Sequence, residues 1–287
     1  RDPEIDAVFV GTPNQWHVPI AMEAIKNDKH VLITKPLADA VEPAKELVEV
    51  AEAAGVVNMM SLSTRFGQDV RYLGQLAQQG EFGDLYYARA RSVRRSGIPY
   101  WSLGFIQQGG GAFRDMGVHV LDSVWWLLGM PRPISATGIS GAKFGPYGKG
   151  YMRFTTPTEE FFSQYATDDY AGGFIRFEDE IGLQVESFWA SHQPPELQIE
   201  LFGDQAGARL KPLTLYRTVN NVPQDATVEF PGGPEGWTKA FDRIADHFIA
   251  CVLDGVENEA PLRHGLIVQE MMEALLKSAE IGQEVFL

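Results

Sequence analysis

Two short apolar runs near the start of the chain, residues 7–10 and 31–33, constrain its fold more than any other feature. A helical spacing of apolar residues separates them. Apolar runs without polar alternation are typical of parallel strands that are covered on both faces. The pattern therefore predicts a strand, a helix and a parallel strand. A further helix at about 41–54 and a strand at 56–61 repeat the unit.

Lys35 lies where a parallel sheet would bind a ligand. In open α/β sheets, ligands bind beyond the carboxyl ends of the strands, which here means residues 11–17 and 34–36. Lys35 directly follows a buried strand and precedes Pro36, which pins its backbone. Its ammonium could polarise a hydroxyl or carbonyl group, or relay a proton. A lysine on a loop surface would leave the same pattern.

After residue 65 the chain changes character. Polar and apolar residues alternate over 85–95, and 145–158 is rich in glycine and proline, as expected for a loop. Strands are expected at 134–143, 172–177, 183–191, 196–202 and 208–210, and helices at 69–78, 236–253 and 262–281. The sequence thus predicts a parallel sheet followed by a larger, mainly antiparallel one with an open face.

A glycine-led helix from Gly109 to Gly129 contains the most suggestive polar residues. Asp115, His119 and Asp122 are spaced by four and three residues, so one helical face could hold all three. A carboxylate beside an imidazole suits proton transfer, because the imidazole titrates near neutrality. The same set is also a metal-ligand pattern. A solvated helix with no chemical role remains the plain alternative.

The loop at 96–108, just before this helix, contains Tyr100 and Trp101. Aromatic rings in such a loop could stack on the apolar face of a sugar. A hydrophobic plug under the loop would have the same composition.

Composition excludes several classes of protein. The 287 residues are 45% hydrophobic and carry a net charge of −14, which argues against nucleic acid or an anionic membrane surface as the main partner. No apolar run approaches the roughly 20 residues needed to span a bilayer. The single cysteine, Cys251, excludes an intrachain disulfide and favours a reducing compartment. We therefore expect a cytoplasmic protein.

Four motifs in order resemble the Gfo/Idh/MocA family of nicotinamide-dependent dehydrogenases. They are DAVFVGTPNQWH, the TKP turn after HVLI, the Arg65-Phe66 pair, and the GGG helix with its D.G.H..D pattern. The resemblance covers nearly the whole chain. It implies a partial Rossmann-like dinucleotide-binding domain at 1–62 and an α+β domain for substrate binding and oligomerisation at 63–287.

The chain departs from the family pattern in two places. Thr34-Lys35-Pro36 replaces the usual Glu-Lys-Pro, so the carboxylate beside the lysine is missing. The family begins with a strand, a GxGxxG turn and a helix, and these are also absent from the 287 residues. Since strand 7–10 would then have an unpaired edge, we expect the 287 residues to be a portion of a longer polypeptide.

The resemblance implies an enzyme that transfers hydride between NAD or NADP and a hydroxyl-bearing carbon of a sugar, polyol or related compound. Lys35, Asp115 and His119 match the catalytic positions. Removing hydride leaves an oxygen that must lose its proton, so the site needs a base and a cation. We expect His119 to be the base, kept neutral by the helix dipole. Asp115 would orient it or contact a hydroxyl, and Lys35 would hold the oxygen or relay the proton.

Two sets of binding residues follow from the same resemblance. The cofactor is expected at Thr12, Pro13, Asn14, His17 and Lys35. The substrate is expected at Arg65, Tyr100, Trp101, Asp115 and His119. No metal is expected, and the assembly is expected to be a homodimer or homotetramer.

Three other functions remain open at this stage. A variant of the family uses bound NAD without net consumption and oxidises a sugar transiently to cleave a glycosidic bond. A metal-dependent hydrolase or isomerase could use Asp115, His119 and Asp122. An inactive assembly or sensing subunit is the third. The sequence names neither the substrate nor a preference for NAD or NADP.

Overall fold

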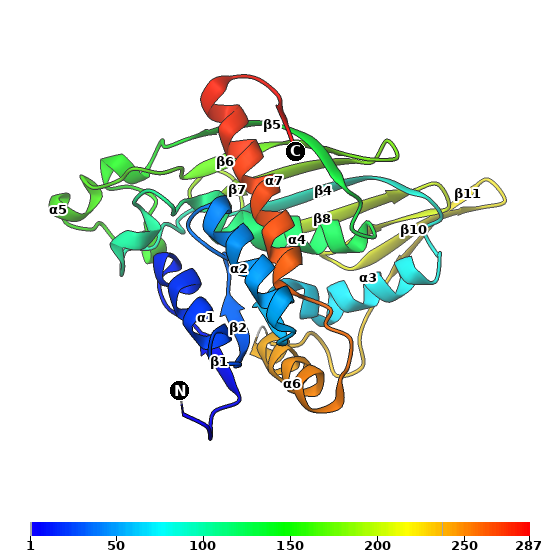
Figure 1. The fold of residues 1–287 in the computed structure, drawn as a ribbon. Helices are drawn as coiled ribbons and strands as arrows, with labels where there is room; N and C mark the ends of the chain where they lie inside the picture. The colour runs from blue at the N-terminus through cyan, green and yellow to red at the C-terminus, as the bar shows by residue number, and fades with distance from the viewer. Residues whose placement is uncertain (1, 237) are drawn as a thin grey trace.

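The small sheet at the start of the chain has the predicted parallel topology. The computed structural model describes residues 2–236 and 238–287. Strands β1 (Ala7–Val10), β2 (His30–Thr34) and β3 (Asn58–Ser61) lie side by side in that order, all parallel. Helices α1 (His17–Ile25) and α2 (Val41–Ala54) connect them (Figure 1). Within the described residues β1 has a strand on one side only.

The large sheet has nine strands, in the order β11-β10-β9-β8-β4-β7-β6-β5-β12. All neighbours are antiparallel except β4 and β7. This confirms the predicted α/β class with a large, mainly antiparallel second sheet. The strands are β4 (Leu85–Val93), β5 (Pro133–Gly141), β6 (Tyr170–Phe177), β7 (Gly182–Phe188), β8 (Glu196–Gly203), β9 (Ala206–Arg209), β10 (Thr214–Val219), β11 (Val222–Thr227) and β12 (Val285–Phe286).

Hairpin β10–β11 and the short strand β12 were not predicted. Every residue of β11 is exposed, as are the last four of β10, so neither strand shows the one-sided burial that produces alternation. Two residues of β12 are too few for any pattern.

The long helices connect the two sheets. α7 (Leu262–Ile281) packs on α2 and β3 on one side and on β5 and β6 on the other (Figure 1). Gln269 on α7 exchanges two hydrogen bonds with the backbone of Ala38, both 3.1 Å long. α4 (Val118–Leu127) lies against β4 and β8. α3 (Gln68–Gln78) and α6 (Thr238–Asp254) contact the turn that follows β3, Ser63–Phe66. Apolar side chains of both sheets share one core.

A second, smaller core lies under the loops that precede α4. Ile98, Met116 and Trp189 are buried there together, and a short helix, α5 (Glu159–Phe162), lies in the loop region that adjoins it. The backbone amides of Lys143, Phe144 and Gly145 donate to the buried Asp169 carboxylate. These bonds fix the predicted glycine- and proline-rich loop to the end of the large sheet.

The three glycines before α4 are required by their backbone angles or by close packing. Gly109 and Gly111 have positive φ angles of 86° and 108°. A Cβ on Gly110 would lie 2.0 Å from the backbone oxygen of Phe105. Side chains at these positions would push the loop away from the helix.

We predict that Gly110→Ala lowers the free energy of unfolding by about 1–3 kcal/mol, the usual cost of overpacking. Gly104→Ala in the same loop is the matched control, because its Cβ would have only Ser102 Oγ nearby, at 3.6 Å. Urea denaturation followed by circular dichroism measures both. Equal midpoints for the two variants would show that the loop yields to an extra methyl group.

Candidate active site

The helix that was expected to carry the chemistry begins with a π-helical turn, Phe113–Gly117. Such turns are rare and are frequent at functional sites. The amide of Phe113 donates to the buried carboxylate of Asp168, over 3.0 Å, which holds the start of the turn. A Cβ on Gly117 would lie 2.5 Å from the Phe113 ring, so this glycine makes room for that ring and not for a ligand.

The side chains of Lys35, which follows β2, and Asp115, in the π-helical turn, are in contact. The Lys35 ammonium donates to the Asp115 carboxylate at 2.7 Å and to its backbone oxygen at 2.6 Å. The other carboxylate oxygen accepts from the indole of Trp189, over 2.9 Å. Burial alone would raise the pKa of Asp115, but the Lys35 charge and the bonds from Lys35 and Trp189 outweigh it and hold this pKa below its ordinary value. Asp115 is therefore an anion at neutral pH.

His119 lies close enough to both groups to interact with their charges. Burial and the charge of Lys35 lower the pKa of His119 to about 3; Asp115 opposes this shift and Arg94 adds to it. The expected neutral imidazole is thus confirmed, but its causes are burial and nearby cations, where the sequence suggested the helix dipole. No residue in the described part of the chain hydrogen-bonds to the ring. A neutral, unengaged imidazole can accept a proton.

The turns after β1 and β2 are held together by His17. Its ring is fully buried, and its nitrogens lie 2.8 Å from the backbone oxygens of Pro36 and Thr12. Thr12 and Pro13 are exposed and Asn14 is half-buried. His17 thus has no face open to a ligand, although it positions two predicted ligand-binding turns.

The structure corrects the interpretation of Arg65. Its guanidinium is completely buried and forms a two-pronged ion pair with Asp122 on α4. It also donates to the backbone oxygen of Glu259, over 2.7 Å, and lies 3.2 Å from His264 Nδ1. The guanidinium of Arg65 is therefore enclosed in a structural network and is not open to a substrate.

The same pair removes Asp122 from the predicted set of Asp115, His119 and Asp122. Burial raises the pKa of Asp122, and the Arg65 charge opposes this without cancelling it. In residues 2–236 and 238–287, no three acidic, histidine or cysteine side chains gather closely enough to hold a metal ion. The geometry therefore disfavours the metal-dependent hydrolase or isomerase.

The aromatic loop lies over the π-turn. Trp101 is 60% exposed, and its ring centroid lies 5.8 Å from that of Tyr100 and 5.6 Å from that of Phe105. Tyr100 and Phe105 pack partly into the small core with Met116. Both interpretations of the loop hold in part, since some of its rings plug the core while Trp101 faces solvent.

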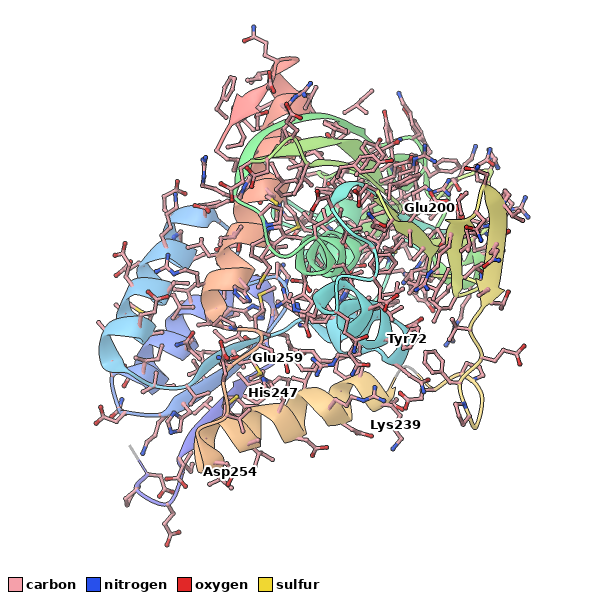
Figure 2. All side chains as sticks on the ribbon, turned by 90° about the vertical axis from the view of Figure 1, so that its right-hand side faces the viewer. Tyr72, Glu200, Lys239, His247, Asp254 and Glu259 are labelled. Carbon is pink, nitrogen blue, oxygen red and sulfur yellow. The ribbon has the colours of Figure 1, made fainter. Side chains whose placement is uncertain are left out.

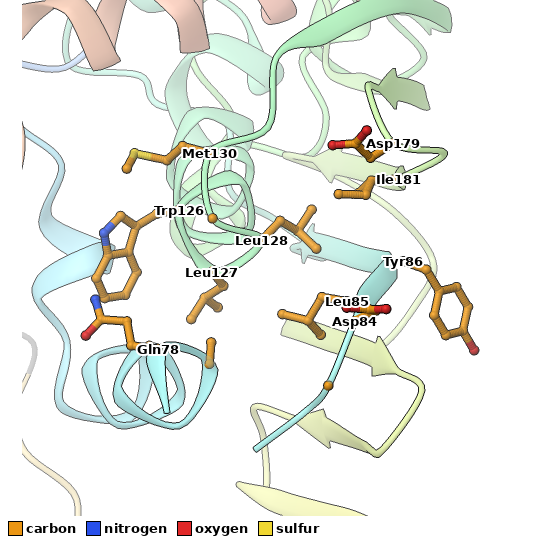
Figure 3. A pocket seen from close by; sticks show the side chains of 14 residues that line it. Gln78, Asp84, Leu85, Tyr86, Trp126, Leu127, Leu128, Met130, Asp179 and Ile181 are labelled. Atoms are coloured by element: carbon orange, nitrogen blue, oxygen red, sulfur yellow. The ribbon is translucent and has the colours of Figure 1, made fainter. Parts of the chain in front are cut away.

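A pocket of about 610 Å³ lies elsewhere, between α3, the end of α4 and the start of β4 (Figure 3). Trp126, Leu128, Met130, Tyr86 and Ile181 are among its lining residues. None of Lys35, Asp115 and His119 lines it, so it is separate from the candidate active site.

Sequence reasoning missed Trp189 and Arg94, which follow strands β7 and β4; only their position at strand ends could have singled them out.

Two family models match the chain. Residues 1–62 match the model described as "Oxidoreductase family, NAD-binding Rossmann fold", and residues 70–209 match the "GFO/IDH/MocA C-terminal domain". The chain belongs to the Gfo/Idh/MocA family. It is accordingly an oxidoreductase with an NAD-binding Rossmann domain.

Individual members of the Gfo/Idh/MocA family extend the comparison. The chain is 28% identical over 285 residues to the D-glucoside 3-dehydrogenase of Escherichia coli (strain K12), covering 98% of this chain and 79% of that protein. It is 31% identical over 111 residues to a glycosyl hydrolase family 109 protein of Shewanella woodyi (strain ATCC 51908 / MS32), covering 39% and 23%. Levoglucosan dehydrogenase in complex with NADH and levoglucosan shares the fold, with a TM-score of 0.85 at 19% identity over 99% of this chain and 80% of that one.

The described residues fit one end of the dinucleotide. Exposed Thr12 and Pro13 and the Lys35 ammonium lie at the carboxyl edge of a parallel sheet, where such folds bind dinucleotides. The 287 residues contain no GxGxxG turn for the pyrophosphate.

Within the described part, no helix is long and apolar enough to cross a membrane.

The lowered pKa of His119 predicts a pH effect on stability. Between its folded pKa of about 3 and its ordinary value of 6.5, the unfolded chain binds a proton that the folded protein does not. The stability of the folded state therefore falls as the pH falls through this window. His119→Gln removes this loss, so acidification from about pH 7 to about pH 4.5 should destabilise the wild type more than the variant.

Denaturant midpoints of both proteins at the two pH values measure the effect. His264, with a pKa lowered to about 4 by burial and Arg65, is present in both proteins, so its contribution cancels. An equal loss of stability in wild type and variant would show that His119 is freely protonated in the folded protein.

Proposed function

We propose that this oxidoreductase transfers hydride between NAD or NADP and a hydroxyl-bearing carbon of a sugar, a polyol or a related compound. One observation carries the proposal: the ammonium of Lys35, at the tip of β2, meets Asp115 beside the neutral imidazole of His119. The likeness to a D-glucoside 3-dehydrogenase supports the substrate class.

Each side chain has a defined task in this proposal. Thr12, Pro13, Asn14 and Lys35 would hold the nicotinamide end of the cofactor, which would supply the hydride chemistry. His119 takes the proton of the substrate hydroxyl, because it is neutral and has no hydrogen-bond partner in the described part of the chain. The Lys35 ammonium stabilises the negative charge that develops on that oxygen. Asp115 holds the ammonium in place and, through Trp189, is itself held.

The binding residues are part of the same proposal. Thr12, Pro13, Asn14 and Lys35 would lie at the nicotinamide end, with His17 as a positioning residue behind them. Tyr100 and Trp101 would cover the substrate over Asp115 and His119. We also propose a division into a dinucleotide-binding domain, 1–62, and a substrate-binding domain, 63–287, which the separate matches at 1–62 and 70–209 support. A cytoplasmic location is proposed on the single free cysteine.

We predict that Lys35→Met and His119→Asn each lower turnover by about 100-fold to 10,000-fold, the usual contribution of acid–base groups. Dinucleotide binding should survive, because neither residue is proposed to contact the adenosine half of the cofactor. Lys45→Met on α2 is the control, since Lys45 pairs with Glu270 and is 51% exposed. Turnover is followed by the absorbance of reduced nicotinamide, and binding by fluorescence titration. Near-normal turnover in either variant would remove the mechanism.

Transient oxidation that leads to glycoside cleavage is the second candidate function, favoured by the likeness to the glycosyl hydrolase family 109 protein. The same base and cation would serve, because the sugar must first be oxidised. An aryl glycoside separates the two functions. Release of the aryl group without net formation of reduced nicotinamide identifies cleavage, whereas accumulation of reduced nicotinamide with the glycosidic bond intact identifies a dehydrogenase.

We further propose that the protein is a homodimer or homotetramer that assembles through the open face of the large sheet. Ile199 and Leu201 of β8 are buried toward α4, so Glu200 between them lies on the opposite face. Figure 2 labels Glu200 at the large sheet. That face carries half-buried aromatic rings, among them Phe174 and Phe202, and no helix packs on it in the described residues. Glu200 Oε2, Arg91 Nε and Arg209 Nε are buried there without a hydrogen-bond partner in that part of the chain.

We expect Phe174→Asp to dissociate the assembly. A two-fold interface contains the same patch from both subunits, so the substitution buries two negative charges in it. Ile249→Asp on α6, at a side chain that is 52% exposed, is the control. Light scattering measures the mass, and circular dichroism checks that both variants are folded. A wild-type mass of one chain, or an unchanged mass in folded Phe174→Asp, would contradict this interface.

A further inference from the structure

Arg94 is a cation near the candidate base that the proposed mechanism does not use. It follows β4, and its backbone amide donates to Phe188 of β7 over 2.9 Å. Its side chain is half-buried and lies along Gly97, where a Cβ would come within 2.4 Å of Arg94 Cδ. The same Cβ on Gly97 would lie 2.8 Å from the backbone oxygen of Trp189, whose indole donates to Asp115, so Arg94 lies beside the candidate active site. Its charge also contributes to the lowered pKa of His119.

The guanidinium of Arg94 forms no ion pair and no hydrogen bond within residues 2–236 and 238–287. The carboxylates of Asp115, Asp168 and Asp169 have other partners. Asp115 binds Lys35 and Trp189, Asp168 accepts from the Phe113 amide, and Asp169 accepts from the amides of the 143–145 loop. A half-buried guanidinium without an acidic partner has five donors available for a ligand.

The segments around Arg94 are cationic in a chain that is strongly acidic. Residues 94–114 contain three arginines and no Asp or Glu, although Arg114 pairs with Glu273 on α7. Residues 141–158 contain Lys143, Lys149 and Arg153 and no Asp or Glu. Backbone bonds join the two segments: the amides of Gly97 and Ile98 donate to Gly150, over 2.9 and 3.0 Å. A net charge of −14 over the whole chain makes this local excess of cations more notable.

We propose that Arg94 binds an anionic oxygen group, a carboxylate or a phosphate, on the substrate of this site. The inference rests on the proposed dehydrogenase function and deepens it by naming a substrate class. Arginine suits both groups, because its planar fork of donors matches their paired oxygens. The cationic segments around it would attract such a substrate from solution.

Two other roles for Arg94 are less consistent with its position. The cofactor phosphates bind at the turns of the Rossmann unit, whereas Arg94 belongs to the large sheet at the junction of β4 and β7. A purely electrostatic role, keeping His119 neutral, requires nothing of Arg94 beyond its charge. That role would affect neutral and anionic substrates alike.

The test compares D-glucose, D-glucuronate and D-glucose 6-phosphate as substrates for the complete protein with NAD or NADP. We expect one of the two anions to have the highest kcat/KM. Arg94→Gln should lower kcat/KM for that anion by about 10-fold to 100-fold, mainly through KM, and change the value for glucose by less than about 3-fold. Arg94→Lys should recover more activity with the phosphate than with the carboxylate, since lysine lacks the planar fork.

Arg95→Gln, at the exposed neighbouring arginine, is the control and should behave as wild type. An equal fall for all three substrates in Arg94→Gln, or a lower affinity for NAD, would overturn the proposal while the dehydrogenase stands. If none of the three is oxidised, calorimetric binding of glucuronate and glucose 6-phosphate decides. Binding that Arg94→Gln abolishes supports the anion site although the proposed reaction fails, and binding that the variant retains, or no binding at all, overturns the anion site.

Discussion

The ion pair between Lys35 and Asp115 is the interaction on which the candidate active site depends. It joins the tip of a strand in the small sheet to a turn that packs on the large one, and Trp189 holds the carboxylate from a third direction. The two charged side chains are only 22% and 19% exposed. A pair this shielded gains little net stability, because desolvation offsets most of the attraction. Its value is positional, since it fixes an ammonium where an oxygen is proposed to become negative.

A second buried pair, Arg65 with Asp122, fixes the same helix further along. It ties α4 to the turn after β3, through Glu259 to the segment before α7, and through His264 to the first turn of α7. Two acids on one helical stretch thus have opposite environments: the pKa of Asp115 is lowered and that of Asp122 is raised. Burial acts on both, so the difference comes from how strongly the partners outweigh it. The first acid faces the proposed chemistry and the second holds the helix.

Local pattern was sufficient to predict the parallel sheet and α7, because each has its own hydrophobic periodicity. Short motifs also singled out Lys35, Asp115 and His119, whose catalytic roles stay a prediction. Contacts between distant segments were not predictable. Arg65 follows a strand of the parallel sheet, as a ligand-binding residue would, yet its partners are Asp122 and Glu259, 57 and 194 residues away. The π-helical turn was not predicted either, because the spacing rule assumes 3.6 residues per turn throughout. That rule places Asp115, His119 and Asp122 on one face.

The proposed roles of His119 and Lys35 do not require the carboxylate that the family usually has before the lysine. Thr34 stands where the family usually has glutamate, and its hydroxyl bonds to the backbone of Val10. A glutamate there would add a negative charge near Lys35, weaken the stabilisation of a developing oxyanion and favour protonation of His119. With threonine, the positive field of Lys35 acts on the imidazole with less opposition. His119 stays neutral through burial and neighbouring charge. In the proposed mechanism, the same field would stabilise the oxygen from which His119 takes the proton.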